Sequence, residues 1–430
     1  MKTKLFSPLI ILTIFLFSCN NSGKVEVKDT SEMHKATQEE IDQLMENFIL
    51  AESGSTIQIP EGFYELNNQL ILDDVKNVIV QGAGMDKTII SFKTLKTGGE
   101  GIKVAGSNNV TLQDFTVYDA PGDGIKTQHC DTMIFRRLNT TWTNGDKSKN
   151  GTYALYPVQC KNVIVDECIA SHSRDAGIYV GQSENVIVKN STAFGNVAGI
   201  EIENCDNAEV YNCKAYDNAG GILVFNLPGL MKADASNTRI FDNEIIENNH
   251  INFALDDSTN SGNAVTQIPP GSGVIILAGK NVEVFNNKIL RNKTVGVVVA
   301  SYQITQYPFD TSNGWSPYSY DIYVHDNEYE RPSALPDLTK ELGKLLSMKN
   351  AYGAMKTQDI VYDGIWDDAR GNDITKNPMN ICFKEPQIDD LHFSYYELSE
   401  KISDIKSYKD YTPFVCEHEV LTDVTSLKEL

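Results

Sequence analysis

A short string recurs along the middle of this chain at intervals of 22–23 residues, and this period constrains the fold more than any other feature. This first string is Gly-Ile-x-Val or a close relative of it, and a second string, Asn-Val-x-Val and its relatives, follows the same period. Several β-rich stretches per period of this length are typical of a parallel β-helix, in which each repeat forms one turn stacked on the next. The first string begins at Gly101, Gly124, Gly177, Gly199, Gly221, Gly273 and Gly296.

We therefore expect an all-β fold, a right-handed parallel β-helix of about nine turns with three short strands in each turn. Neighbouring turns would lie about 4.8 Å apart. Some intervals between repeats are longer, and they fit the same turn with inserted loops near residues 143–151, 226–237 and 250–272. Loops of this kind gather on one face of a repeat protein and often carry its function.

Alignment on the repeat predicts columns of inward-facing residues. Stacked asparagines in such a column can hydrogen-bond one another along the axis of the helix, and the cysteines are expected to be small buried residues. A disulfide between Cys130 and Cys160 on adjacent turns remains an alternative, although its geometry is demanding. One column reads Phe115, Leu138, Cys168, Ser191, Cys213, Asn243, Asn287 and Asn327, and another reads Ser107, Cys130, Cys160, Ser183 and Cys205.

Both ends of a β-helix must be covered, because open strand edges invite association. Thr37 and Glu40 form a capping-box pattern that predicts a helix running to about Ala51 as an N-terminal cap. We assign residues 35–331 to the β-helix with this helix, and residues 332–430 to an irregular C-terminal cap. The cap is expected to contain an amphipathic helix, and Cys382 and Cys416 are its plausible disulfide pair. The apolar positions of that helix are Leu338, Leu342, Leu345 and Leu346.

The N-terminus has the features of an export signal. Lys2 and Lys4 precede an apolar run over residues 5–17, which is too short to span a bilayer of about 30 Å. Its end, Leu16-Phe17-Ser18-Cys19, resembles a bacterial lipobox, which implies removal of residues 1–18 and lipidation of Cys19. Residues 19–34 would then be a lipidated tether to a bacterial membrane, and the protein would work outside the cytoplasm. An ordinary signal peptide with an incidental Cys19 is the alternative.

Charge and cysteine spacing exclude several functions. The 37 Lys and Arg residues are outnumbered by 58 Asp and Glu residues, which gives a net charge of −21. Such a chain repels phosphate backbones, so we expect no nucleic-acid partner. None of the eight cysteines forms a C-x-x-C pair, which removes the commonest zinc, redox and c-type haem spacings.

Several strings of the repeat region resemble a known family. The segment 54–64 is similar to the first turn of pectate-lyase-like β-helices, and residues 156–160, 175–183, 198–204 and 220–225 are similar to strings of the exported parallel β-helix repeat proteins of Gram-negative bacteria, which are often lipoproteins. The resemblance covers about residues 52–330. It implies a β-helix without an assigned reaction, working with a co-exported partner protein, in a superfamily that includes polysaccharide lyases, uronan C5-epimerases and hydrolases.

The x position of Gly-Ile-x-Val should face outward, because its neighbours Ile and Val face inward. Turn residues just upstream, and the long loop before Tyr156, should lie near this row. The outward row reads Lys103, Lys126, Tyr156, Tyr179, Glu201 and Leu223; the turns add Asp119, Asp123, His172, Arg174 and Asp175; and the loop adds Trp142, Asp146, Lys147, Lys149 and Tyr153.

This set of residues suits uronic-acid chemistry. Lyases and epimerases remove a proton next to a carboxylate, which requires a base and a cation that offsets the developing charge. The candidate base is Lys126 or His172, the candidate acid is Tyr179 or Tyr156, and the neutralising group is Arg174 or a bound Ca²⁺. Asp119, Asp123 and Asp175 are candidate Ca²⁺ ligands. Trp142, Lys147, Lys149, Tyr153 and Glu201 are candidate contacts to a polysaccharide substrate.

Other interpretations stay open. A pair of the aspartates could serve hydrolysis, the face could bind a glycan without catalysis, or the chain could be a scaffold for a co-exported protein. The outward rows could also be no more than solvated side chains of a soluble β-helix, and Glu201 and Glu203 in particular could simply face solvent. A second aromatic group suits sugar stacking, a protein interface or packing against the C-terminal cap; it comprises Tyr302, Tyr307, Phe309, Trp315, Tyr318 and Tyr320.

Overall fold

The computed structural model describes residues 28–254, 264–399, 401–422 and 427. The predicted signal peptide, Cys19 and most of the predicted tether lie outside the described residues. The chain divides into two units, Met1–Glu32 and Met33–Leu430, and the second holds every described helix and strand. Across the described residues, no helix combines the length and the apolar character needed to cross a bilayer.

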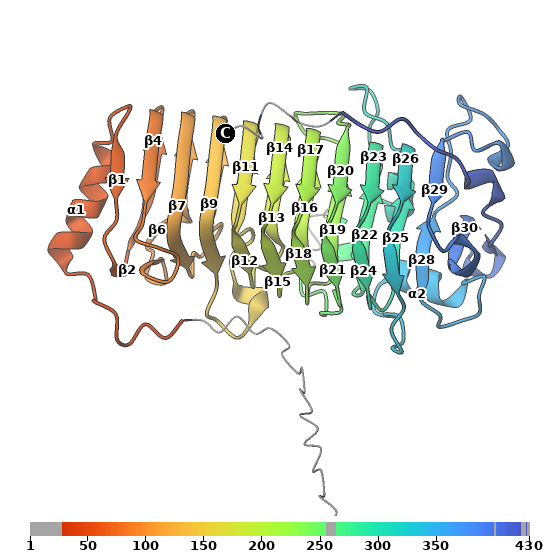
Figure 1. Cartoon of the computed structure of the whole chain (residues 1–430), viewed down its shortest axis with the longest axis horizontal. Coiled ribbons are helices and arrows are strands. Elements are labelled where there is room, and N and C mark those ends of the chain that lie inside the picture. Colours follow the sequence, from red (N-terminus) through yellow and green to blue (C-terminus); the bar gives the residue numbers. More distant parts are fainter. Residues whose placement is uncertain (1–27, 255–263, 400, 423–426, 428–430) are drawn as a thin grey trace, which may run out of the picture. The chain divides into compact units, whose positions relative to one another are not determined.

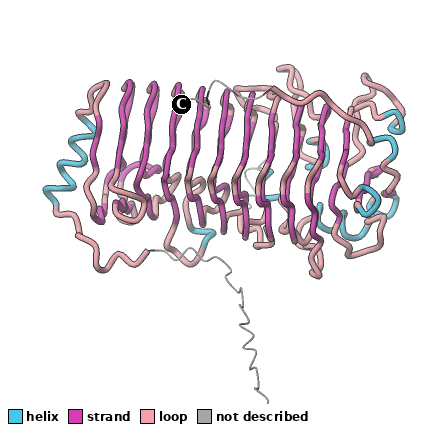
Figure 2. The backbone as a smooth tube through the Cα atoms, viewed as in Figure 1, coloured by secondary structure: helices cyan, strands magenta, loops and turns pink. Residues whose placement is uncertain are grey.

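Parallel strands lie side by side along the second unit, and the helices are short and few (Figures 1 and 2). The strands form three ladders, two of which merge into a 19-stranded sheet because the long strands β7 and β9 belong to both. The first of these two ladders contains β1 (Thr56–Gln58), β4 (Lys76–Gln81), β7 (Asn108–Tyr118), β9 (Asp131–Thr141), β11 (Lys161–Asp166), β14 (Glu184–Lys189), β17 (Asp206–Tyr211), β20 (Thr238–Phe241), β23 (Lys280–Phe285), β26 (Tyr320–His325) and β29 (Ile381–Lys384). The second contains β2 (Gly62–Glu65), β5 (Thr88–Ser91), β7, β9, β12 (Ile169–Ser171), β15 (Thr192–Phe194), β18 (Lys214–Tyr216), β21 (Glu244–Ile246), β24 (Lys288–Leu290) and β27 (Glu328–Glu330).

The third ladder is a separate 12-stranded sheet, and its outer face carries the candidate site. Eleven of its strands pair in parallel, and the last, β31, pairs antiparallel to β30. Its strands are β3 (Asn68–Asp73), β6 (Thr97–Ala105), β8 (Ile125–Gln128), β10 (Leu155–Val158), β13 (Ala176–Gly181), β16 (Ala198–Glu203), β19 (Gly220–Phe225), β22 (Ser272–Leu277), β25 (Val295–Ala300), β28 (Gln358–Tyr362), β30 (Phe393–Glu397) and β31 (Lys406–Tyr408).

This architecture confirms the predicted parallel β-helix, but the number of turns exceeds nine. The strands β28, β29 and β30 come from the segment that was expected to be a cap, and they continue the ladders by pairing with β25, β26 and β28. The Gly-Ile-x-Val and Asn-Val-x-Val strings do not recur in that segment. Its strands were therefore invisible to a search for repeats, although their alternating apolar residues still fill the interior.

The repeat period sets the register of the paired strands, and this register stacks similar residues on one another in the core. Val163 on β11 pairs with Val186 on β14, and Ile178 on β13 pairs with Ile200 on β16, so that like residues stack from turn to turn. The predicted asparagine column is confirmed: Asn243 donates its side-chain N–H to Oδ1 of Asn287 at 2.9 Å, and Asn287 donates to Asn327 at 3.0 Å.

The cysteines of the interior columns are free and buried, so the alternative of a Cys130–Cys160 disulfide is wrong. The two thiols instead point at carbonyl oxygens of their own turns, Cys130 at Gln128 and Cys160 at Val158, each at 3.3 Å. Cys382 and Cys416 do form a disulfide, which ties β29 to the segment after it.

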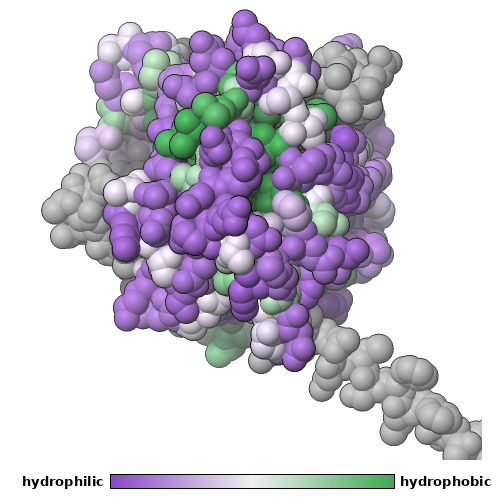
Figure 3. All heavy atoms as spheres, turned by 90° about the vertical axis from the view of Figure 1, so that its left-hand side faces the viewer, coloured by the Kyte–Doolittle hydropathy of each residue, from purple (hydrophilic) through white to green (hydrophobic). Residues whose placement is uncertain are grey.

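Helices cover both ends of the ladders. The helix α1 (Gln38–Ile49) begins with the predicted capping box, in which the Glu40 carboxylate accepts from the Thr37 backbone N–H at 2.7 Å. Leu44 and Phe48 of α1 are buried against the first turn. The surface at this end is mainly hydrophilic, with apolar side chains confined to a smaller area (Figure 3). The helix α2 (Glu341–Met348) starts later than expected, so that Leu338 precedes it and is exposed.

Short 3-10 helices complete the described elements. They lie in connections between strands and in the C-terminal segment. They are η1 (Lys147–Lys149), η2 (Ala264–Gln267), η3 (Tyr302–Thr305), η4 (Ile374–Lys376), η5 (Ile388–Asp390), η6 (Ile402–Asp404) and η7 (Thr412–Phe414).

Loops pack on the outer face of the 12-stranded sheet and form a second apolar cluster there. Outward-facing Leu223, Ile275 and Val298 are buried beneath residues of η2, η3 and α2. An outward position on this sheet is therefore exposed near the N-terminal turns and buried farther along. This gradient decides which of the predicted site residues can meet a substrate.

Candidate functional site

The predicted outward row exists on the 12-stranded sheet. Lys126 on β8 pairs with Tyr156 on β10, Tyr179 on β13 pairs with Glu201 on β16, and Glu201 pairs in turn with Leu223 on β19. Side chains of successive strands therefore stand next to one another, one strand spacing of about 4.8 Å apart.

Three tyrosine rings contact one another at the centre of the row. The ring centroid of Tyr153 lies 4.6 Å from that of Tyr156 and 4.6 Å from that of Tyr179, and the last two rings meet edge to face at 5.0 Å. The Lys126 ammonium lies 4.8 Å from the centroid of the Tyr156 ring and 3.6 Å from the Glu100 carboxylate. A cation thus stands at the exposed edge of an aromatic group.

Three carboxyl groups lie beneath and beside the tyrosines: Asp175, Glu201 and Glu203. All three are buried, and Oδ1 of Asp175 and Oε2 of Glu201 lack a hydrogen-bond partner. The hydroxyl of Tyr179 donates to Oε1 of Glu203. We refer to these three carboxyl groups and the tyrosines Tyr153, Tyr156 and Tyr179 as the tyrosine–carboxylate cluster.

Burial controls the protonation of the cluster. It raises the pKa of Asp175, Glu201 and Glu203 above their ordinary values, because a charged carboxylate loses its hydration there. The charge of Glu203 raises the pKa of Asp175 and Glu201 further. The hydrogen bond from Tyr179 opposes this shift at Glu203. The buried carboxyls therefore retain protons to a higher pH than exposed ones, and the cluster is less negative than its composition suggests.

Asp123 lies beside Tyr156, a member of the cluster, on the accessible side of the cluster. Burial raises the pKa of Asp123 to about 6, although the nearby charge of Lys126 lowers it. Burial also raises the pKa of Tyr156 to about 12, so that its phenol is protonated at neutral pH. Near neutral pH, Asp123 is thus a carboxylate of unusual basicity and Tyr156 is a proton donor.

Accessibility divides the predicted residues into two groups. Lys126, Tyr153, Tyr156, Asp123 and Arg174 are partly exposed. The side chains of Tyr179 and Glu201 are only 5% and 1% exposed, so neither can contact a polymer. The expectation that Glu201 contacts substrate, or that Glu201 and Glu203 are solvated, is wrong, because the second apolar cluster closes over this part of the sheet.

Arg174 lies next to the cluster and is held by the preceding turn. Its backbone N–H donates to the Gly151 carbonyl at 2.9 Å, and its guanidinium donates to the Thr152 hydroxyl at 3.1 Å. The positive charge of Arg174 lowers the pKa of both Asp175 and Asp123 against the effect of burial. Arg174 is therefore a second cation at the accessible side.

Three other predicted residues have their contacts elsewhere. Nδ1 of His172 is 3.0 Å from the Thr141 hydroxyl, Lys147 Nζ is 3.0 Å from His250 Nε2, and Lys149 pairs with Asp146 at 3.2 Å. Burial and the charge of Lys147 lower the pKa of His172 to about 4, so its ring is neutral at physiological pH. The contact between Lys147 and His250 ties the loop over 143–151 to another segment.

Two predicted roles do not fit the geometry. Trp142 is buried and donates its indole N–H to the Ala120 carbonyl at 2.6 Å, so it cannot stack on a sugar. Asp119 accepts two hydrogen bonds from Thr143, at 2.7 and 2.8 Å. In the described part of the chain, no group of three or more His, Cys, Asp or Glu side chains is placed to hold a metal ion. Asp119, Asp123 and Asp175 therefore do not form the expected Ca²⁺ site.

The second aromatic group is partly interior. Tyr302 and Trp315 are buried and meet edge to face at 5.4 Å, and the Trp315 indole donates to the Asn226 carbonyl at 3.2 Å. Phe309 is 39% exposed and packs on both rings. For Tyr302 and Trp315 the structure thus favours packing over sugar stacking.

Sequence reasoning missed three contributors to the site. Glu203 is the hydrogen-bond acceptor of Tyr179, Glu100 pairs with Lys126, and Gly181 leaves the space in which the Tyr179 ring lies. A signal was present for two of them. Gly181 and Glu203 each lie two residues after a row position, and strand alternation places such residues on the same face.

The comparisons with known proteins agree with this architecture. Residues 100–260 match the protein-family model described as "Right handed beta helix region". The strand ladders show the same fold from β1 to β30, so the chain is a right-handed parallel β-helix protein. Among curated proteins, none matches the sequence.

Solved structures resemble the chain at low identity. The A-module of the mannuronan C-5 epimerase AlgE4 of Azotobacter vinelandii is 16% identical, with 75% of this chain and 86% of that chain covered and a TM-score of 0.48. The DFA-IIIase of Arthrobacter chlorophenolicus A6 is 13% identical, with 78% and 92% covered and a TM-score of 0.43. The alginate lyase AlyF-OU02 is 13% identical, with 83% and 71% covered and a TM-score of 0.45.

Proposed function

We propose that this protein binds an acidic polysaccharide at the tyrosine–carboxylate cluster and acts on its uronic-acid units as a lyase or C5-epimerase. One observation carries the proposal. A basic carboxylate, a protonated phenol and a cation, from Asp123, Tyr156 and Lys126, share the accessible side of a group of buried carboxyls. These are the three functions that proton abstraction next to a carboxylate requires.

The charge of the site is compatible with an anionic substrate. The buried carboxyls have raised pKa values and hold protons more readily than exposed ones. Lys126 and Arg174 supply positive charge on the accessible side. An acidic sugar therefore meets two cations there, while the rest of this acidic protein repels polyanions.

Lys126, Asp123 and Tyr156 each have a separate role in the proposed reaction. The side chain of Lys126 offsets the negative charge of the sugar carboxylate as the C5–H bond breaks, and the Asp123 carboxylate accepts that proton. In a lyase, the electron pair of the C5–H bond forms the C4=C5 double bond, the C4–O bond breaks, and Tyr156 protonates the leaving oxygen. In an epimerase, Tyr156 instead returns a proton to C5 from the opposite face.

The test is to incubate the purified protein with polymannuronate, polyguluronate and polygalacturonate. Ultraviolet absorbance of the C4=C5 double bond reports elimination, and proton NMR of the recovered polymer reports inversion at C5. We expect one polymer to show one of these changes. If all three polymers stay intact but one binds, the function reduces to glycan binding, and if none binds, the proposal is wrong.

We also propose that the protein acts outside the cytoplasm, anchored to a bacterial membrane by a lipid on Cys19 and assisted by a co-exported protein. The lipobox-like residues 16–19 and the Cys382–Cys416 disulfide support an extracytoplasmic location, because disulfides persist in oxidising compartments. Labelling with an alkyne fatty acid should mark the native protein but not a Cys19→Ala variant. A pull-down of the labelled protein tests for the partner, and recovery of no exported protein would contradict that part.

A further inference from the structure

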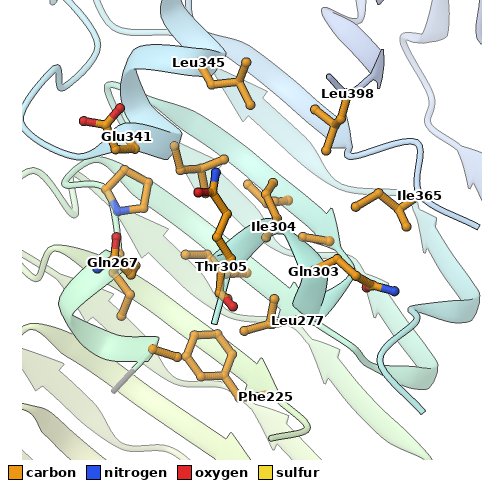
Figure 4. Close-up of a pocket in the computed structure, with 18 of the residues that line it drawn as sticks. Phe225, Gln267, Leu277, Gln303, Ile304, Thr305, Glu341, Leu345, Ile365 and Leu398 are labelled. Atoms are coloured by element: carbon orange, nitrogen blue, oxygen red, sulfur yellow. The ribbon is translucent and has the colours of Figure 1, made fainter. Parts of the chain in front are cut away.

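A cavity of about 760 Å³ lies on the outer face of the 12-stranded sheet, farther along the ladder than the tyrosine–carboxylate cluster. Phe225 on β19, Leu277 on β22 and Val298 on β25 line it from the sheet. Residues of η3, of α2 and of the segment after β30 line the other sides. Phe225 and Leu277 lie across the cavity from Leu345 and Leu398 (Figure 4). The volume falls within the range of small-molecule pockets.

The lining is aliphatic rather than aromatic. Phe225 is its one aromatic residue among those that the structure describes. Aliphatic walls offer dispersion contacts without the flat stacking faces that sugar rings and bases use. The aliphatic contributors include Ile268, Ile275, Ile304, Leu342, Ile365 and Ile405.

The polar groups of the lining define what a ligand must carry. Gln303 lines the cavity, and its Oε1 is buried without a hydrogen-bond partner. Such an oxygen favours a ligand that donates an O–H or N–H. Glu341 is the one ionisable residue among the described lining residues, and its carboxylate pairs with Lys344. Because the described part of the lining offers no cation, a free carboxylate or phosphate on a ligand would stay unpaired there.

We propose that this cavity binds a single aliphatic chain with an uncharged head group that donates a hydrogen bond, as in a fatty alcohol or a monoacylglycerol. The inference is independent of the proposed polysaccharide chemistry. From Tyr156 to Ile275, one of the lining residues, the outward row runs through Tyr179, Glu201 and Leu223, a separation of four strand spacings or about 19 Å.

The test uses the whole purified protein and 1-N-phenylnaphthylamine, an uncharged apolar fluorophore. We expect the fluorophore to bind and to be displaced by 1-decanol and by monodecanoylglycerol, and at least tenfold less effectively by the decanoate anion. Equal displacement by decanoate and 1-decanol would overturn the assignment of an uncharged head group. Absence of fluorophore binding would overturn the site itself.

Variants locate the binding. Val298→Trp fills the cavity and should weaken fluorophore binding at least tenfold. Ile71→Trp is the matched control, because Ile71 is an exposed position in the same outward row and pairs with Lys103. Gln303→Leu should retain the fluorophore but lose at least fivefold in affinity for 1-decanol. Unchanged binding by Val298→Trp, with circular dichroism showing a native fold, would place the fluorophore elsewhere and contradict the proposal.

Discussion

The hydroxyl of Tyr179 donates a hydrogen bond to Oε1 of Glu203 across the position of Gly181, which pairs with Glu203 in the ladder. A side chain at position 181 would occupy the space that the Tyr179 ring fills. The bond gives a buried carboxylate a strong donor where water has little access. Glycine at one turn thus lets a tyrosine reach the carboxylate of the next turn.

Tyr179→Phe should destabilise the protein more at high pH than at low pH. The hydroxyl lowers the pKa of Glu203 against burial, so its removal raises that pKa further and makes the carboxylate more costly to form. We expect a loss of about 1–3 kcal/mol at pH 8 and a smaller loss at pH 5. Urea unfolding midpoints at both pH values measure this.

Tyr396→Phe is the matched control for that experiment. Tyr396 is also buried on the 12-stranded sheet, but its hydroxyl accepts a hydrogen bond from the Gln358 amide at 3.1 Å, and neither partner is a carboxylate. Its loss of stability should be the same at pH 5 and pH 8. An equal loss at both pH values for Tyr179→Phe would contradict the assigned role of its hydroxyl.

Gly181→Ala should displace the Tyr179 ring, because the added Cβ would overlap it. Overpacking of this kind costs about 1–3 kcal/mol. Gly99→Ala is the control, since nothing lies within 4 Å of an added Cβ at that position. Chemical denaturation should show a clear loss for the first variant and a change within about 0.5 kcal/mol for the second. If the two variants were equally stable, the space beside the Tyr179 ring would accommodate a Cβ, and the hydrogen bond to Glu203 would not require glycine at position 181.

The interior of the fold was predictable because the period acts on it directly. Residues one repeat apart, such as Val163 and Val186, must stack if turns of equal length are superposed. The same logic found the asparagine column that ends in Asn327. It did not extend to β28, β29 and β30, whose residues face the interior without repeating the strings of earlier turns.

The candidate site was only partly predictable, because the repeat says which residues face outward and not what covers them. Lys126 and Tyr156 face solvent as expected. Glu201 occupies the same row but is buried, since residues inserted much later in the chain fold back over it. Trp142 was mispredicted for a different reason, because its indole packs in the interior and donates to the carbonyl of Ala120, which precedes it in the chain. Coverage by distant loops is a tertiary property that no local pattern reports.

Asp123→Asn should stabilise the protein relative to the wild type, and this gain should grow as the pH rises. The pKa of this carboxyl is about 6 in the folded chain against 3.8 ordinarily. Its folded form therefore binds a proton more readily than its unfolded form, and stability is lost as the pH rises from about 4 to above 6. The full effect is about 3 kcal/mol, and the uncharged variant escapes it.

Denaturation midpoints of both proteins between pH 4.5 and pH 8 test that effect. The gap between variant and wild type should widen in favour of the Asp123→Asn variant up to about pH 7 and then stay constant. Parallel curves over this range would show that Asp123 titrates at its ordinary pKa, and would remove it as the proposed base.

Asn287→Ala should be among the costlier substitutions of the interior. The side chain of Asn287 accepts from the backbone N–H of Asn243 at 3.1 Å and donates to the Ile240 carbonyl at 2.9 Å, so its loss leaves buried groups of two turns unpaired. We expect a loss of about 2–4 kcal/mol. Asn67→Ala, at an exposed position, should change stability by no more than about 0.5 kcal/mol. Thermal unfolding followed by circular dichroism distinguishes them, and a mild effect at Asn287 would mean that water replaces the column.

Lys126→Met and Tyr156→Phe should each lower the rate of uronan elimination or epimerisation by at least about a hundredfold, because each removes a group that acts on the developing charge or the transferred proton. Both substitutions keep the shape of the side chain, so binding of the polymer should fall less than turnover. Lys103→Met is the matched control, because Lys103 is the neighbour of Lys126 in the same outward row, one turn earlier. Initial rates on the best polymer, with binding measured separately by calorimetry, decide the matter. Full activity in both site variants would place the chemistry away from the tyrosine–carboxylate cluster, and an equal loss in Lys103→Met would show that only the charge of the face matters.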